Sequence, residues 1–130
     1  MTTTMTKTMT TADRFHEQAL AASPREMAGL LEEVLTRELA AFTIGVDDPD
    51  LVRRWASGEE TAMTDRPVEA RLRAAYEIVL LLLGHDAPRT IRGWFFGRKT
   101  DLGEASPAEA IRDDRFEEAS LVAHAFLAHG

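Results

Sequence analysis

The stretch DRPVEARLRAAYEIVLLLLG, residues 65–84, decides the fold. Asp65 and Pro67 favour the start of a helix, and Gly84 favours its end. The leucines at 80–83 make the last turn apolar on all sides, which is typical of a helix at the centre of a molecule or in an interface. Because the longest apolar run, residues 78–83, is far shorter than the ~20 residues that cross a bilayer, we expect no membrane-spanning segment.

Further helices are predicted on both sides of this stretch. Ser23-Pro24-Arg25-Glu26 and Ser106-Pro107-Ala108-Glu109 each combine a capping serine, a proline in the first turn and a glutamate that can reach back to the cap. A shorter helix is expected from Pro88 to Gly97, and a final helix after the Ser106 cap is expected to take in Phe116, Ala119, Ala123 and Phe126. No segment alternates convincingly with period two, so the sequence predicts an all-α chain.

Composition limits the class of protein. The 130 residues suit one domain, and the absence of cysteine excludes disulfides and cysteine nucleophiles. The first ten residues contain no apolar block of the kind found in a secretion signal, so we expect a cytoplasmic location. Residues 1–22 are expected to be a disordered tail or a short helix, since residues 1–11 are a low-complexity mixture of threonine and methionine.

The net charge of -7 is unevenly distributed along the chain. Residues 25–60 hold four basic and nine acidic side chains, residues 61–100 hold seven and four, and residues 101–130 hold two and seven. An acidic chain binds nucleic acid poorly without a local cluster of cations. Any contact with DNA is therefore expected to be confined to a small part of the surface.

Residues 23–62 are predicted to form a helix-turn-helix region. Within it, the pattern indicates a short helix, a turn centred on Gly45, a second helix from about Pro49 and a stop at Gly58. A unit of this kind also needs small and apolar residues that hold its helices at a fixed angle. Residues of these types are Ala40, Ala41, Val46 and Trp55.

The second helix of this region presents candidate DNA-binding side chains. Arg53 and Arg54 carry guanidinium groups that can pair with guanine edges or phosphates, and Ser57 lies one turn further on. The aspartates at 47, 48 and 50 repel phosphate at the end of the helix that normally enters the groove. Two interpretations stay open: a DNA-binding unit, and a structural helical hairpin that does not bind DNA.

The aromatic cluster Trp94, Phe95 and Phe96 has three possible uses. A helix this short cannot bury all three rings unaided, although Trp94 follows Ile91 at core spacing. Stacking on single-stranded bases would suit rings beside Arg98 and its neighbouring lysine, but the next segment is acidic. Packing in the core explains Trp94, and an interface with another protein explains the remaining aromatic residues.

No catalytic or metal site is indicated. The histidines are scattered, and His124 and His129 are five residues apart rather than the four that place two ligands on one helix face. The carboxylate pairs have the spacing of exposed helix faces, and no glycine-rich loop follows a strand. We therefore expect no enzymatic activity, no metal and no cofactor.

The order of these motifs resembles the Xre/MbcA/ParS-like antitoxins over roughly residues 25–130. The residues that carry the resemblance are Gly45-Val46, Val52-Arg53-Arg54-Trp55, Trp94-Phe95, Leu102-Gly103 and Pro107 to Ile111. The resemblance implies a helical toxin-binding region over residues 63–130, after the helix-turn-helix region. Glu104 departs from the family, which often has a second glycine at this point.

The resemblance also implies a function. Such a chain is the antitoxin of a type II system: it binds and neutralises a RES-domain toxin, whose family consumes NAD, and NAD would belong to the toxin. It implies promoter binding as a symmetric oligomer, alone or with the toxin. The residues that it assigns to toxin binding are Trp94, Phe95, Phe96, Arg98, Leu102, Pro107 and Ile111.

Two other functions are alternatives to the antitoxin. A stand-alone helix-turn-helix regulator would use the C-terminal region only for dimerisation, and it would bind palindromic DNA without a neighbouring toxin gene. A small enzyme built on a carboxylate pair is disfavoured, because no pair is accompanied by an orienting partner.

Overall fold

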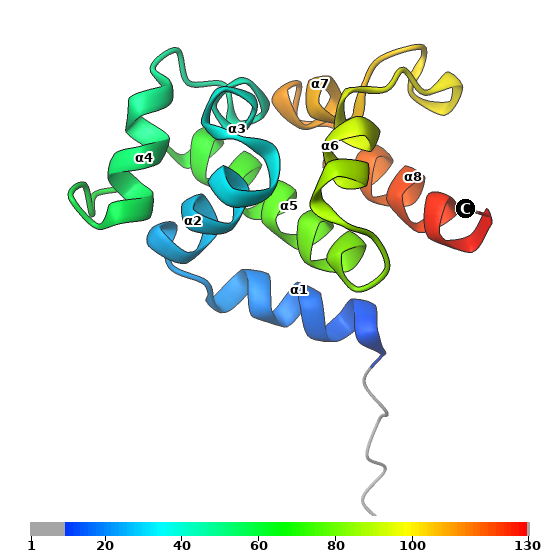
Figure 1. The fold of residues 1–130 in the computed structure, drawn as a ribbon, viewed down its shortest axis with the longest axis horizontal. Coiled ribbons are helices and arrows are strands. Elements are labelled where there is room, and N and C mark those ends of the chain that lie inside the picture. Colours follow the sequence, from blue (N-terminus) through cyan, green and yellow to red (C-terminus); the bar gives the residue numbers. More distant parts are fainter. Residues whose placement is uncertain (1–9, 130) are drawn as a thin grey trace, which may run out of the picture.

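The computed structural model describes residues 10–129, and within them the expected all-helical fold is confirmed (Figure 1). The only strand-like pairing in this range is a single bridge between Lys99 and Ala105. The helices are α1 Thr11–Ala21, α2 Pro24–Leu35, α3 Arg37–Ile44, α4 Pro49–Ser57, α5 Arg66–Leu83, α6 Pro88–Phe96, the 3₁₀ turn η1 Thr100–Leu102, α7 Pro107–Arg112 and α8 Phe116–His129.

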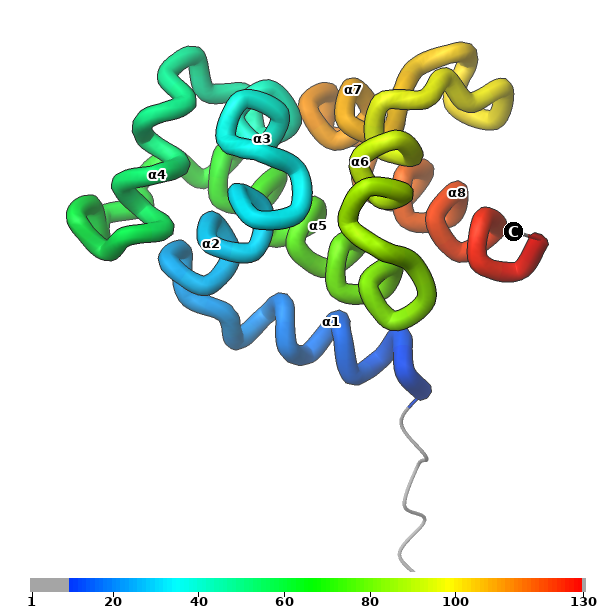
Figure 2. The backbone as a smooth tube through the Cα atoms, viewed as in Figure 1, coloured from blue at the N-terminus to red at the C-terminus, as the bar shows by residue number. Residues whose placement is uncertain are grey.

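Helix α5 runs through the middle of the molecule, with α2 to α4 on one side, α6 to α8 on the other and α1 crossing below (Figures 1 and 2). It packs against α1, α2, α3, α6, α7 and α8. Leu72, Val79 and Leu82 on α5 are fully buried, which accounts for the apolar end of this helix. No helix within residues 10–129 is long and apolar enough to span a membrane.

The N-terminal helix begins at the edge of the described range. Residues 1–9 of the predicted tail lie outside that range, and α1 starts from a capping box formed by Thr10 and Asp13. Arg73 on α5 holds the other end of α1, since its Nη1 donates to the main-chain oxygens of Ala19 and Ala22. Segment 1–22 therefore contains a short helix attached to α5.

The two serines predicted to cap helices do so in the structure. Ser23 and Ser106 each accept from the amide three residues ahead, and Glu26 and Glu109 bond back to the cap amides. Helix α7 is short because Asp114 has a positive φ of 65°, which separates α7 from α8.

Helices α3 and α4 are joined by a short turn and both pack against α2. Gly45 ends α3 with a φ of 79°, a conformation that side chains disfavour. The guanidinium of Arg71 lies directly over Gly45, donates to the main-chain oxygen of Ile44 and pairs with Asp114 at 2.9 Å. A single arginine of α5 thus ties this turn to the segment between α7 and α8.

Candidate functional site

Both predicted DNA-binding arginines are paired with a carboxylate of their own helix. Asp50 accepts from Arg53 Nε at 2.6 Å and from Arg54 Nη1 at 2.9 Å, and Arg53 also pairs with Glu59 at 2.8 Å. The bond from Arg53 holds the pKa of Asp50 below its usual value, and the bond to Asp50 raises the pKa of Arg53. The positive charge of α4 is therefore largely compensated within the chain.

Ser57, the third predicted DNA contact, lies exposed at the end of α4. Its hydroxyl donates to the main-chain oxygen of Arg54 at 3.1 Å and accepts from the amide of Glu59 at 3.3 Å. The hydroxyl thus helps to end α4, and contact with a ligand would compete with these bonds.

Five of the seven residues predicted to bind the toxin lie in the interior: Trp94, Phe95, Leu102, Pro107 and Ile111. The rings of Trp94 and Phe95 meet edge to face with centroids 5.1 Å apart, and Trp94 lies 6.1 Å from Phe126 of α8. These side chains join α6 to α7 and α8. In this structure they pack inside the chain and support the surface above them, and the toxin contact that the resemblance implies for them stays a prediction.

Phe96 and Arg98 are the two predicted residues that remain at the surface. Phe96 keeps 43% of its area exposed at the end of α6. Gly93 lies one turn earlier, exposed, and a Cβ atom added there would meet no described atom within 4 Å apart from its chain neighbours and the backbone of its own helix. Helix α6 therefore presents an aromatic ring beside an open backbone.

Sequence reasoning missed a second exposed ring that belongs to α3. Phe42 is 40% exposed, and the guanidinium of Arg112 from α7 lies 4.8 Å from its ring centroid. Arg112 Nη1 also donates to the main-chain oxygen of Phe42 at 2.7 Å. Helix periodicity could have predicted the exposure of Phe42. Its position on α3 lies outside the face that Ala40, Ala41 and Ile44 bury.

Among the described residues, the arginines near these rings form no direct ion pair with a carboxylate, although the charge of Arg98 helps to lower the pKa of Glu109. Within residues 10–129, none of the four arginines at 89, 92, 98 and 112 forms an ion pair. The arginines at 14, 25 and 66 form none either, whereas those at 37, 53, 54, 71, 73 and 115 do. Two of the four donate to main-chain oxygens instead: Arg92 to Val34 and Arg112 to Phe42. We call this set the α6 surface: Phe42, Arg89, Arg92, Phe96, Arg98 and Arg112.

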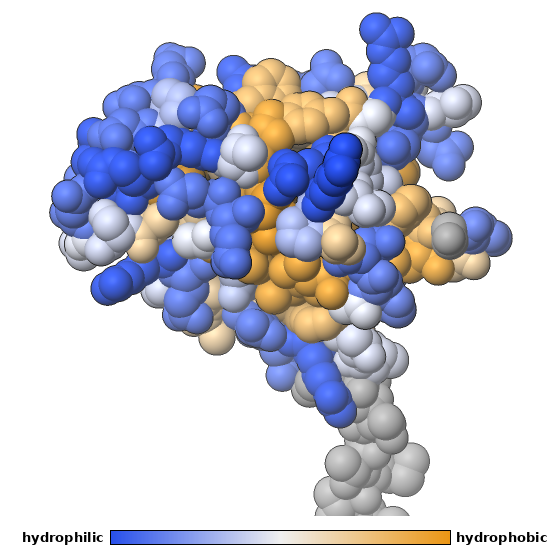
Figure 3. Space-filling view, viewed as in Figure 1, coloured by the Kyte–Doolittle hydropathy of each residue, from blue (hydrophilic) through white to orange (hydrophobic). Residues whose placement is uncertain are grey.

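The α6 surface lies where three helices adjoin. Helix α7 packs against both α3 and α6, and α6 packs against α2. Figure 3 shows apolar atoms between α3 and α6, with strongly hydrophilic side chains beside them over α6. The site therefore combines exposed apolar area with unpaired positive charge, although the chain as a whole is acidic.

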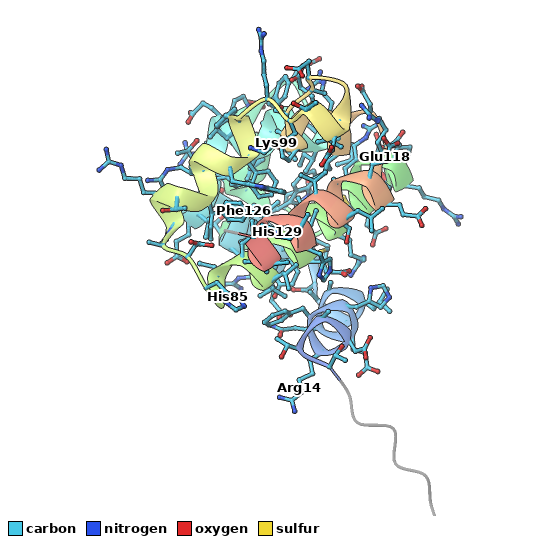
Figure 4. The ribbon with its side chains drawn as sticks, turned by 90° about the vertical axis from the view of Figure 1, so that its right-hand side faces the viewer. Arg14, His85, Lys99, Glu118, Phe126 and His129 are labelled. Atoms are coloured by element: carbon cyan, nitrogen blue, oxygen red, sulfur yellow. The ribbon has the colours of Figure 1, made fainter. Side chains whose placement is uncertain are left out.

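Lys99 lies beside the buried part of this site. Its ammonium is 5.7 Å from the centroid of the Trp94 ring, and Figure 4 shows Lys99 and Phe126 on the side where α6 and α8 meet. Partial burial lowers the pKa of the Lys99 amine. Lys99 forms no ion pair with any residue from 10 to 129, so its charge adds to that of the α6 surface.

Acidic and histidine side chains do not gather into a metal site within the described part of the chain. Asp50, Glu109 and Glu118 each have a lowered pKa, because each accepts a hydrogen bond from a neighbour on its own helix or cap. These carboxylates have local structural roles at helix ends.

Comparison with known proteins identifies no relative: the chain matches no protein-family model, and neither a curated protein nor a solved structure is significantly similar to it. The kind of partner is therefore inferred from the exposed phenylalanines and the arginines of the α6 surface.

Proposed function

We propose that this chain is a cytoplasmic antitoxin that binds and neutralises a RES-domain toxin through the α6 surface. The observation that carries the proposal is the presence of two exposed phenylalanines among four arginines without ion pairs, on a chain of net charge -7. Aromatic residues and arginine are enriched where proteins bind one another. The choice of a RES-domain toxin as the partner rests on the resemblance of the sequence motifs to those of the antitoxin family.

The chemistry of the α6 surface specifies what the partner must offer. An arginine without an internal carboxylate can form a bidentate pair with a carboxylate of another chain. Phe42 and Phe96 lose apolar area exposed to water when they enter a pocket. We therefore expect an acidic rim around an apolar pocket on the toxin.

Co-purification with the toxin tests the proposal. We expect Phe96→Ala and Arg98→Ala each to weaken binding by more than about 1 kcal/mol if they are anchors, with little change in folding, since both side chains are exposed. Leu20→Ala, at a 60% exposed leucine of α1, is the matched control. A folded Phe96→Ala, Arg98→Ala double variant that retains full affinity would reject this surface as the binding site.

A second proposal concerns DNA: repression of the antitoxin's own operon, or a stand-alone regulator whose C-terminal region serves for dimerisation. The support is the short turn between α3 and α4 and their joint packing on α2, which is compatible with a helix-turn-helix. The pairing of Arg53 and Arg54 with Asp50 opposes it, because phosphate or base contacts must replace these bonds.

A gel-shift assay with the upstream DNA at defined salt decides between DNA binding and a structural hairpin. If α4 reads DNA, Asp50→Asn raises affinity by removing the carboxylate that both arginines share, although Arg53 keeps its pair with Glu59. A double Arg53→Ala, Arg54→Ala variant lowers the affinity. If the wild type never shifts the fragment, α3 and α4 are a structural hairpin.

A further inference from the structure

We propose that α8 pairs antiparallel with the α8 of a second copy of this chain. Leu121, in the middle of α8, is 65% exposed, more than any other large apolar side chain within residues 10–129. Isolated exposed leucines are common on proteins, so the argument depends on what surrounds this one.

The exposed face of α8 is centred on Leu121. Helical spacing places Glu117, His124, Ala125 and Ala128 on the same side as Leu121, and all of them are exposed. The opposite side, with Ala119 and Ala123, is fully buried. Small residues beside the leucine leave room for another helix to approach closely.

The polar side chains on this face indicate that the occupant is a second copy. Glu117 and Glu118 are in the first turn of α8, and His124 and His129 are in its second half. In an antiparallel pair the glutamates of each helix lie beside the histidines of the other, and a histidine ring N–H can donate to a carboxylate, whereas a parallel pair would bring glutamates together. The face is thus complementary to itself under a two-fold axis, as an isologous dimer requires.

Glu117 and Glu118 differ in whether they are already paired within their own chain, and this decides which of them can contact the second copy. Glu118 pairs with Arg115 of its own chain at 2.6 Å, and this bond lowers its pKa. Glu117 has no ion pair within residues 10–129. We therefore assign the contact with a histidine of the second copy to Glu117.

Hollows on both sides of Leu121 can receive side chains of the second copy. One, of about 260 Å³, lies between α1, α5 and α8, where Ile78, Phe116 and Ser120 form part of its wall. The other, of about 440 Å³, is lined by residues 114–118 and Leu121. An interface of one helix pair is small, so side chains that enter the first hollow, where Ile78, Phe116 and Leu121 are apolar, would add buried apolar area.

Sedimentation analysis of the full chain over a range of concentrations tests the pairing. We expect a monomer–dimer equilibrium for the wild type and a monomer for Leu121→Asp at the same concentrations. Leu20→Asp is the matched control: it introduces the same charge at an equally exposed leucine, at the end of α1 away from the residues of α1 that adjoin α8. This control should dimerise like the wild type, and circular dichroism checks that each variant is folded.

A charge exchange tests the antiparallel arrangement. Glu117→Lys should weaken the dimer at least several-fold, and adding His124→Glu should restore it, because the new lysine and glutamate can pair across the axis. A wild type that stays monomeric at all concentrations would overturn the proposal, as would a Leu121→Asp variant that dimerises normally. If the wild type is monomeric and Leu121→Asp instead loses the toxin, α8 contacts the toxin and the self-pairing is rejected.

Because Leu121 and Glu117 are not part of the α6 surface, the two interfaces can be tested separately. A Phe96→Ala, Arg98→Ala variant that loses the toxin should still dimerise. Loss of dimerisation without loss of toxin binding would leave the proposed function intact.

Discussion

The ammonium of Lys99 lies 5.7 Å from the centroid of the Trp94 ring, and it covers a side chain that is otherwise enclosed by the protein. Trp94 packs against Phe95 and Phe126, so it joins α6 to α8. Its Nε1–H is buried without a hydrogen-bond partner in the described part of the chain. The indole therefore contributes through packing, and its polar atom opposes that contribution.

Substitutions of Trp94 separate the packing of its ring from the cost of its unpartnered Nε1–H. We expect Trp94→Ala to lower the free energy of unfolding by about 3–5 kcal/mol, because it leaves a cavity where α6 meets α8. Trp94→Phe keeps an aromatic ring and removes the unpartnered N–H, so it should cost much less, about 1 kcal/mol or below. Denaturant unfolding measures both. An equal loss of unfolding free energy in the two variants would contradict a role through packing. If Trp94→Ala alone no longer binds the toxin, the cause would be unfolding rather than a missing contact.

Lys99 should titrate below the ordinary lysine value of 10.5, because burial beside the indole disfavours its charged form. NMR of ¹³C-methylated lysines can measure this pKa, since Lys7 is the only other lysine. Lys99→Met assigns the signal by removing it. In denaturant the shift should disappear, and a folded-state pKa at or above 10.5 would show that the ammonium is fully hydrated.

Local features of the sequence predicted most of the helix boundaries. Ser23, Pro24, Gly45 and Gly58 act on the backbone within one turn, so their effects can be read without knowing what packs nearby. The pairing of Arg53 with Asp50 is also local, three residues apart on one helix, and could have been predicted from spacing.

The composition of the candidate site could not be predicted in the same way. Phe95 and Phe96 are adjacent and chemically identical, and only the helices packed against α6 decide that the first is buried and the second exposed. Arg112 and Phe42 are 70 residues apart, so no local pattern connects them. The site depends on tertiary packing, and of its surface residues the sequence assigned only Phe96 and Arg98 to partner binding, through the family resemblance.

Glycine substitutions should have opposite effects at Gly93 and Gly45. Gly93 lies within α6 with open space around it, so Gly93→Ala should stabilise the isolated chain by about 0.5–1 kcal/mol. Gly45→Ala should destabilise it by about 1–3 kcal/mol, because φ is 79° and the new Cβ would lie 2.6 Å from Arg71 Nη1. Thermal unfolding measures both.

Toxin affinity provides a second measurement for variants of Gly93. A larger side chain, as in Gly93→Leu, should weaken toxin binding while the chain stays folded, if a partner backbone approaches α6 there. Gly29→Leu on α2 is the matched control, since Gly29 also lies within a helix with nothing near its Cβ position. Equal toxin affinity for both leucine variants would remove Gly93 from the interface.

The capping box of α7 should make stability depend on pH. Hydrogen bonds from Ser106 hold the pKa of Glu109 below its ordinary value of 4.5, and the charge of Arg98 contributes in the same direction. A carboxyl whose pKa is lowered by folding stabilises the folded state above its unfolded pKa, and this contribution is lost as the pH falls through the folded pKa. Stability from Glu109 should therefore be present at neutral pH and decline below pH 4.5.

Two variants distinguish the charge of Glu109 from its hydrogen bond. Glu109→Gln can still accept the Ser106 amide, which is 2.9 Å from Glu109 Oε1, but it does not titrate. The difference in unfolding free energy between wild type and Glu109→Gln should thus shrink as the pH falls below 4.5, whereas Glu109→Ala loses the bond and should remain less stable than Glu109→Gln at every pH. Asp50 and Glu118 also have lowered pKa values and are unchanged in these variants, so the comparison isolates Glu109. A wild type and Glu109→Gln that keep the same difference from neutral to acid pH would show that the charge does not contribute to the cap.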